Sequence, residues 1–158
     1  MFASIQFVSF DRRRLQRVLA AAATCACAAM AAAADAPLKT TTLKVGAHNL
    51  KVEVAASDPQ REKGLMNRPQ LGRNDGMLFV FDVPAYHAMW MKNTLIPLSV
   101  AFVDKDGAIL NILDMEPQTL DSHQSAGPAI YAIETNKGWF EKKKIKAGDK
   151  VTGLPGKK

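Results

Sequence analysis

Short apolar runs separated by turn residues limit the possible folds of this chain more than any other feature. The clearest case is "LSVAFVDKDGAILNIL", residues 98 to 113, where two apolar runs flank the four residues from Asp104 to Gly107. An Asp-Gly pair tolerates the positive φ angles of a tight turn, so this stretch predicts two strands joined as a hairpin. At least part of the chain is therefore expected to be antiparallel β-sheet.

Four further runs predict strands. "LKVEVA" (50 to 55) alternates apolar and polar residues with the period of a half-buried strand. "TTTLKV" (40 to 45) is expected to pair with it across the turn at residues 46 to 49. "GMLFVF" (76 to 81) is a continuous apolar run that fits a buried strand, and "AIYAIE" (129 to 134) predicts another.

Helix signals are few. Ser57 can cap a helix that has Pro59 in its first turn, Gln60 in a capping box and Gly64 near its end. A second short helix is expected from Trp139 to Lys144. We therefore predict a mainly β chain: a single small β-sandwich or partly open barrel with one or two short helices.

The N-terminal 34 residues have the features of a secretory signal. Four arginines, at positions 12 to 14 and 17, precede an alanine-rich apolar run that ends with Ala32-Ala33-Ala34. We predict cleavage after Ala34 and a periplasmic or secreted product, with the general secretory route favoured over the twin-arginine route. A retained membrane anchor is the alternative, because the run approaches the length of a span. Residues 35–39 would be a short tether, 40–154 the domain and 155–158 a tail.

Removal of this signal would change both cysteine content and charge. Cys25 and Cys27 lie inside it, so the processed chain would have no disulfide, no thiolate zinc site and no cysteine nucleophile. It would retain 17 basic and 14 acidic side chains, a net charge of about +3. The basic run "EKKKIK" (141 to 146) has no interleaved aromatic residues, so we expect no nucleic-acid binding. We also expect a monomer that has no membrane contact after cleavage.

Several motifs, in order along the chain, resemble the domain of unknown function 192 family, whose members are small bacterial and archaeal proteins that are often exported. They are "REKGLMNR" (61 to 68), "GMLFVF" (76 to 81), "WMKNTLIPL" (90 to 98), "MEP" (115 to 117) and "YAIETNKGWF" (131 to 140). The resemblance implies a mainly β sandwich with jelly-roll character and no established activity. One departure is Ser99, where the family commonly has aspartate, so a catalytic carboxylate is missing there.

Polar and aromatic residues within these motifs form the candidate ligand site. Amides and hydroxyls can fix the hydroxyl groups of a sugar while aromatic faces stack on its ring, and arginines supply fixed cations. The candidate ligand-binding residues are Arg61, Arg68, Trp90, Lys92, Asn93, Thr94, Glu134, Asn136 and Trp139. The alternative for each is structural. Arg61 would pair with Glu134, the asparagines would bind loop backbone, and the tryptophans would close the ends of the sandwich.

A second candidate site is the row His87, Met89 and Met91 in "HAMWM". On a strand these three side chains would share one face, and imidazole with thioethers suits Cu(I). Methionines also fill gaps in apolar cores, and we favour that interpretation. The histidines have no metal-ligand spacing, and the chain has no phosphate loop, nucleophile elbow or zinc-protease motif. We therefore expect no metal and no cofactor.

Three function classes follow. The leading hypothesis is an exported binding module for a small polar or carbohydrate-like ligand. The second is a hydrolase or lyase acting on envelope glycans, with Glu134 as acid or base; Asp114 or Glu116 would complete a carboxylate pair. The third is a structural or accessory periplasmic protein. Whether Arg61, Asn93, Glu134 and Trp139 face a common pocket separates these classes.

Overall fold

The computed structural model of the protein describes residues 37–156, which belong to a compact unit spanning Pro37–Lys158. The predicted signal peptide, residues 1–34, lies outside the described residues, as do residues 35–36 of the predicted tether and 157–158 of the tail. No helix among the described residues is long and apolar enough to cross a bilayer.

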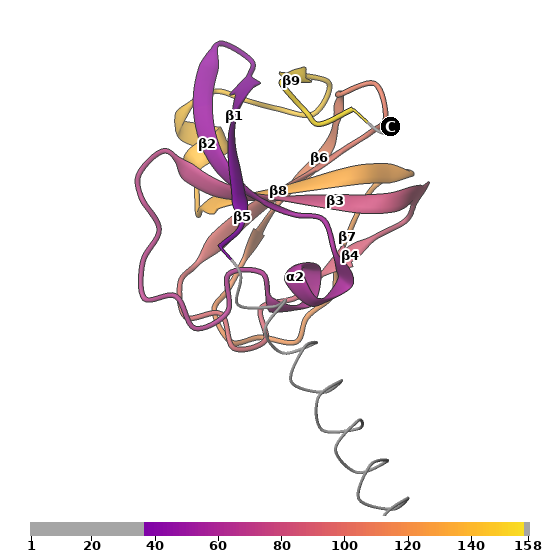
Figure 1. Ribbon diagram of the computed structural model, residues 1–158. Coiled ribbons are helices and arrows are strands. Elements are labelled where there is room, and N and C mark those ends of the chain that lie inside the picture. Colours follow the sequence, from indigo (N-terminus) through magenta and orange to yellow (C-terminus); the bar gives the residue numbers. More distant parts are fainter. Residues whose placement is uncertain (1–36, 157–158) are drawn as a thin grey trace, which may run out of the picture. The chain divides into compact units, whose positions relative to one another are not determined.

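The domain is built on a seven-stranded sheet in the order β6-β5-β8-β3-β2-β1-β9 (Figure 1). Its strands are β1 (Lys39–Val45), β2 (His48–Ala55), β3 (Asp75–Ala85), β5 (Leu98–Val103), β6 (Ile109–Met115), β8 (Ala129–Asn136) and β9 (Val151–Thr152). All neighbours are antiparallel except β2 and β3, which run parallel. A separate two-stranded ribbon pairs β4 (Ala88–Met89) with β7 (His123–Gln124). The prediction of a mainly β fold is confirmed.

Both predicted hairpins are present, and the second helps to curl the sheet. β1 pairs with β2, and β5 pairs with β6 across the Asp104–Gly107 turn. Gly107 has a φ of +80°, and a Cβ there would lie 2.6 Å from the carbonyl oxygen of Val151, so glycine is required. The Val151 amide donates to the Gly107 carbonyl at 2.8 Å, and the backbones of Ala108 and Lys150 form an isolated antiparallel β-bridge. Residues beside the outermost strands therefore meet, which makes the sheet a partly open barrel.

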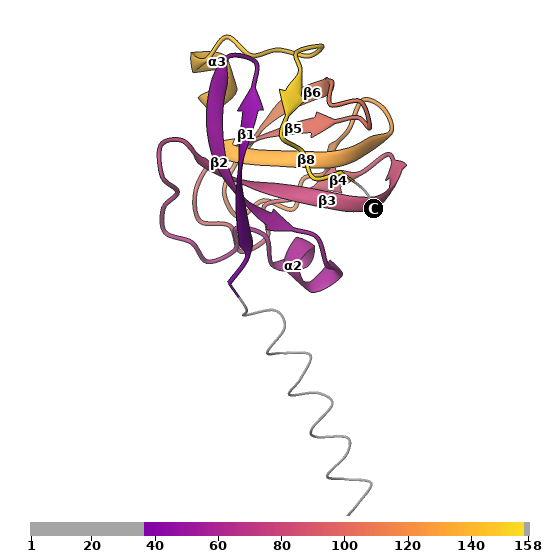
Figure 2. The ribbon, with the colours of Figure 1, turned by 45° about the horizontal axis from the view of Figure 1, so that its top comes forward.

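Two short helices lie at opposite ends of the sheet (Figure 2). α2 (Asp58–Lys63) connects the parallel strands β2 and β3, and the predicted Ser57–Gln60 capping box is present at its start. The Gln60 side chain accepts hydrogen bonds from the amides of Ala56 and Ser57. α3 (Trp139–Lys142) is shorter than predicted, because Lys144 has a left-handed φ of +58° that ends the helical path.

The sheet buries apolar side chains on both faces. Along β3, Leu78 packs into one cluster while its neighbours Met77 and Phe79 pack into another, as alternation along a strand requires. We call the face that carries Met77 the Met77 face. Every residue of β5 is buried, so both faces are covered at this strand. The Met77 face is the one that positions the candidate site.

Candidate functional site

Two glutamates lie on the Met77 face, on strands that flank β3. Glu53 on β2 and Glu134 on β8 are both directly opposite Met77, and Val100 on β5 is the next neighbour of Glu134. Side chains directly opposite one another on paired strands share a face of the sheet. Glu134 therefore projects into apolar surroundings, between the side chains of Met77 and Val100.

A pocket of about 420 Å³ lies over this part of the face. α2 and the residues that follow it form one wall, and the end of β3 with β4 forms another. Apolar side chains such as Leu65, Phe79 and Met89 line much of it. Four of the predicted site residues line it together: Arg61, Trp90, Thr94 and Glu134. The volume is in the range of small-ligand sites.

Glu134 is the most unusual group in this pocket. The residue is only 3% exposed, and burial alone raises the pKa of its carboxyl from 4.5 to about 8. The carboxyl itself has no hydrogen bond or ion pair with another described residue. Within residues 37–156, no side-chain oxygen is both sealed from solvent and unpartnered, so the Glu134 carboxyl must reach the pocket space. At neutral pH this carboxyl is mostly protonated.

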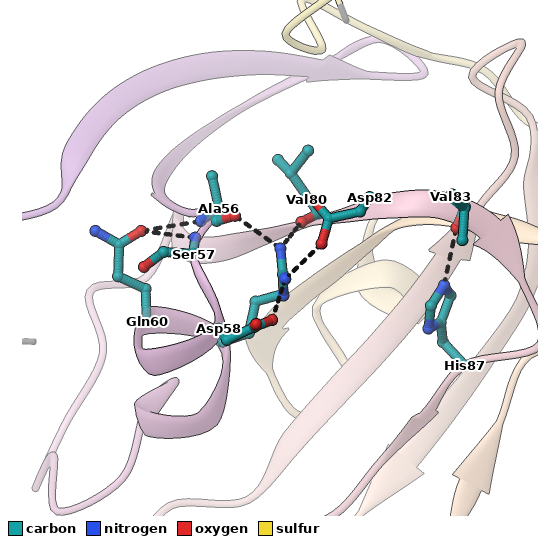
Figure 3. A network of polar contacts seen from close by, with 9 residues as sticks. Ala56, Ser57, Asp58, Gln60, Val80, Asp82, Val83 and His87 are labelled. Carbon is teal, nitrogen blue, oxygen red and sulfur yellow. Dashed lines mark hydrogen bonds and ion pairs between the residues drawn. The ribbon is translucent and has the colours of Figure 1, made fainter.

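Arg61 lines the pocket but is held by the protein itself. Its partners Ala56, Asp58, Val80 and Asp82 are labelled in Figure 3, where dashed lines mark the contacts. One terminal nitrogen donates to the carbonyl oxygens of Ala56 and Val80, at 2.7 Å each. The other donates to Asp58 and, at 2.8 Å, to Asp82. The alternative pairing of Arg61 with Glu134 is therefore not formed. The guanidinium fixes the start of α2 against the end of β3.

The segment after β4 supplies the exposed rim. Trp90 is 52% exposed, and the ammonium of Lys92 lies 5.8 Å from the centroid of its ring. Lys92 does not line the pocket. Thr94 is buried beside the pocket, and its hydroxyl lies 3.3 Å from the Lys92 carbonyl. Trp90 thus presents an aromatic surface at the pocket entrance.

The other predicted site residues lie elsewhere and contact protein groups. Arg68 forms a two-point ion pair with Glu53 beside a second pocket of about 500 Å³. Asn136 donates to the carbonyl oxygens of Leu71 and Gly72, as the structural alternative predicted.

Trp139 and Asn93 are also outside the pocket. Trp139 is buried, and its indole N–H donates to the Asn74 side chain at 3.2 Å. Asn93 is exposed with a φ of +54°, and its carbonyl accepts a hydrogen bond from the Asn67 amide. Of the four residues chosen to separate the function classes, Arg61 and Glu134 thus share the pocket, while Asn93 and Trp139 do not.

The predicted His87-Met89-Met91 row is not a continuous strand face, because β4 covers only Ala88 and Met89. Met91 is fully buried within the apolar cluster of the Met77 face, and Met89 packs against that cluster. The His87 ring stacks on Phe81, with ring centroids 3.6 Å apart, and its Nε2 lies 3.3 Å from the Val83 carbonyl. Each of the three side chains thus has a packing contact, as the favoured interpretation expects.

The proposed carboxylate partners of Glu134 are engaged elsewhere. Asp114 accepts a hydrogen bond from the Ser99 hydroxyl at 2.5 Å, and Glu116 pairs with Lys137. Neither lines the Glu134 pocket. Ser99 also accepts from the Gly138 amide, so the serine at this departure from the family pattern links β5, β6 and the start of α3. Residues 37–156 contain no cluster of three His, Cys, Asp or Glu side chains suited to a metal ion.

Sequence reasoning overlooked several pocket residues. Asp82 follows the apolar run 76 to 81, and Asp58 opens the first helix, so each sits where a polar residue is ordinary. The available sequence signal is the spacing of Asp58, which lies three residues before Arg61. An aspartate three residues before an arginine on a helix is a recognised pairing pattern. The contact with Asp82 depends on the tertiary packing of α2 on β3.

Comparison with known proteins places the chain. Residues 40–153 match the domain of unknown function 192 family, DUF192, described as "Uncharacterized ACR". The chain belongs to the DUF192 family. A crystal structure from Sinorhizobium meliloti 1021, described as a candidate transcription regulator, is 33% identical with a TM-score of 0.71, covering 74% of this chain and 95% of that one. A protein of unknown function from Novosphingobium aromaticivorans DSM 12444 is 34% identical with a TM-score of 0.70, covering 72% and 85%. No curated protein matches.

Proposed function

We propose that this DUF192 protein binds a small polar or carbohydrate-like ligand in the pocket above Glu134. The observation that carries the proposal is the Glu134 carboxyl, which is buried, faces the pocket and has no partner within residues 37–156. A buried polar group without a hydrogen bond destabilises the fold, and such groups concentrate at functional sites. A ligand that hydrogen-bonds to this carboxyl would remove that cost.

The remaining surfaces suit such a ligand. Trp90 offers an exposed aromatic face at the entrance, on which the apolar face of a sugar ring can stack. Arg61 is immobilised by four hydrogen bonds, so the wall formed by α2 is held in place before the ligand arrives. A site that is already ordered loses less conformational entropy on binding.

Glycan hydrolysis is the second candidate function, because the raised pKa of Glu134 suits a general acid at neutral pH. A hydrolase also needs a second carboxylate across the substrate. Asp58 and Asp82 are tied to Arg61. The remaining carboxyl, Glu62, is exposed, and no contact with a described residue holds it in place opposite Glu134. Binding is therefore the function that the geometry supports best.

Export and a monomeric state accompany this proposal. The arginine cluster and apolar run of residues 1–34 support export, and a periplasmic location would give access to envelope glycans. The description of one relative as a transcription regulator does not lead us to propose nucleic-acid binding. Helices of six and four residues, the two in the described part of the chain, are too short to act as recognition helices.

The test is an NMR titration of isotope-labelled protein with a panel of neutral, basic and acidic monosaccharides and disaccharides. We expect at least one class to shift the resonances of Trp90, Thr94 and Leu65 together. Trp90→Ala should weaken that binding at least tenfold. Leu120→Ala is the matched control, since Leu120 is 69% exposed and does not line the pocket. A panel that leaves all pocket resonances unchanged would refute the proposal.

A further inference from the structure

The charges around the pocket are unevenly balanced. Four carboxyl side chains line it, and they are Asp58, Glu62, Asp82 and Glu134. Two cationic side chains, Arg61 and Lys63, also line it, together with His87. Acidic groups therefore exceed cationic groups by one when either Glu134 is protonated or His87 is charged, and the two kinds balance only when both hold. A clustered excess of one charge sign attracts ligands of the opposite sign.

Arg61 is not available as an anion clamp. Its two terminal nitrogens donate to the carbonyls of Ala56 and Val80 and to the carboxylates of Asp58 and Asp82. A guanidinium has five N–H donors, so one is left, and two carboxylates already offset its charge. An anionic ligand would therefore find neither a free fork of donors nor a net positive charge at this residue.

The buried and unpartnered carboxyl of Glu134 is an independent observation, and it limits which charge the ligand can carry. Its side chain is more than nine-tenths buried, reaches the pocket and has no partner in the described part of the chain. An anion would be repelled whenever the carboxyl is ionised. A neutral hydroxyl can hydrogen-bond to the protonated carboxyl but leaves the ionised form without a compensating charge. An ammonium group supplies both up to three donors and a compensating charge.

We propose that the ligand of this pocket carries a protonated amino group, which forms an ion pair with the carboxylate of Glu134. The inference rests on the proposed function and names the charge class of its ligand. The exposed ring of Trp90 supports it, since aromatic faces attract cations. The ligand class is then an amino sugar or a similar polar amine.

Ion pairing has a proton-linked consequence. The carboxyl of Glu134, whose pKa burial raises to about 8, must lose its proton to pair with an ammonium ion. Binding of an ammonium ion below pH 8 therefore releases a proton to the buffer. The affinity rises with pH until the lower of two pKa values is passed, that of the free carboxyl or that of the amine. A neutral sugar would bind with no such release.

The experiment compares three hexoses that differ in one group: glucosamine, glucose and glucuronate. Binding to the full chain without its signal is measured at pH 6, where the amine is protonated, by NMR titration and by calorimetry in two buffers of different ionisation enthalpy. We expect glucosamine to bind at least tenfold more tightly than glucose, glucuronate to bind weakest, and glucosamine alone to release about one proton. Glu134→Gln should abolish the preference. Glu53→Gln, a glutamate on the same face outside the pocket, should preserve it.

Equal binding of glucose and glucosamine, or preference for glucuronate, would overturn this inference and leave the proposed function intact. Retention of the amine preference in Glu134→Gln would also overturn it, because another group would then be the counter-ion. If none of the three sugars shifts any pocket resonance, this inference fails. The broader panel of monosaccharides and disaccharides described above then decides whether the proposed function stands.

Discussion

Glu53 and Glu134 occupy equivalent places on either side of Met77, yet their surroundings differ. Arg68 forms a two-point ion pair with Glu53, and its hydrogen bonds lower the pKa of that carboxyl despite partial burial. Glu134 has no such partner, and burial raises its pKa to about 8. Glu53 thus has its hydrogen-bonding partner within the protein, whereas the carboxyl of Glu134 has none among the described residues. The difference supports our proposal that the ligand binds in the pocket above Glu134 and not in the pocket beside Glu53.

The largest expected effect comes from removing the side chain between the two glutamates. Met77 is fully buried, so Met77→Ala should cost about 2 to 5 kcal/mol of unfolding free energy, measured by urea denaturation. The cavity should also admit water beside Glu134 and lower its pKa. Leu78→Ala is the control, since Leu78 is equally buried on the opposite face. It should destabilise the protein similarly without moving the pKa of Glu134. An equal pKa change in both variants would contradict the role of the Met77 face.

Glu134→Gln should stabilise the protein. In the folded state the carboxyl keeps its proton up to about pH 8, whereas in the unfolded chain it loses it near 4.5. The wild type therefore loses stability as pH rises between these two values, at about 1.4 kcal/mol per pH unit. Glutamine mimics the protonated form and does not titrate, so the variant should be more stable by about 3 kcal/mol at pH 7 and equal near pH 4. A destabilised variant at pH 7 would mean that the carboxylate is paired in the folded protein.

Arg68→Ala should have the smallest effect and the opposite pH dependence. Both partners of the Glu53–Arg68 pair are about a third exposed, so solvent weakens it and the expected loss is about 1 kcal/mol at pH 7. Because the pKa of Glu53 is lowered, this contribution is present above pH 4.5 and disappears as pH falls through the folded-state pKa. Denaturation of wild type and variant from pH 2 to pH 7 measures it. A loss that persists at pH 2 would assign the effect to packing of the arginine stem.

The parts of the fold that were predictable depend on local chemistry. The turn at Asp104–Gly107 needs a residue that accepts positive φ, and the capping box at Ser57 needs a partner three residues away, so both are readable from neighbours in sequence. The parallel pairing of β2 with β3 is not local, because it depends on how α2 returns the chain to the sheet. The row from His87 to Met91 includes only a two-residue strand, Ala88–Met89, for a similar reason, since its partner β7 is only two residues long.

The candidate site was predictable in part. Arg61 and Glu134 were identified through the family resemblance, but the contact that holds Arg61 involves Asp82, which only tertiary packing brings close. Trp139 was placed in the site because polar residues precede it. Its burial follows from the docking of α3 and the hydrogen bond to Asn74, which lies 65 positions earlier in the chain. Periodicity within a single element does not report such distant partners.

The most direct test of the proposed ligand site is a carbon-13 NMR titration of the side-chain carboxyls in the ligand-free protein from pH 2 to pH 10. We predict that the Glu134 carboxyl titrates near pH 8 and that Glu53 titrates below 4.5. A Glu134 carboxyl that titrates near 4.5 would show that it is solvated or paired. The observation that supports the proposed ligand site would then be lost.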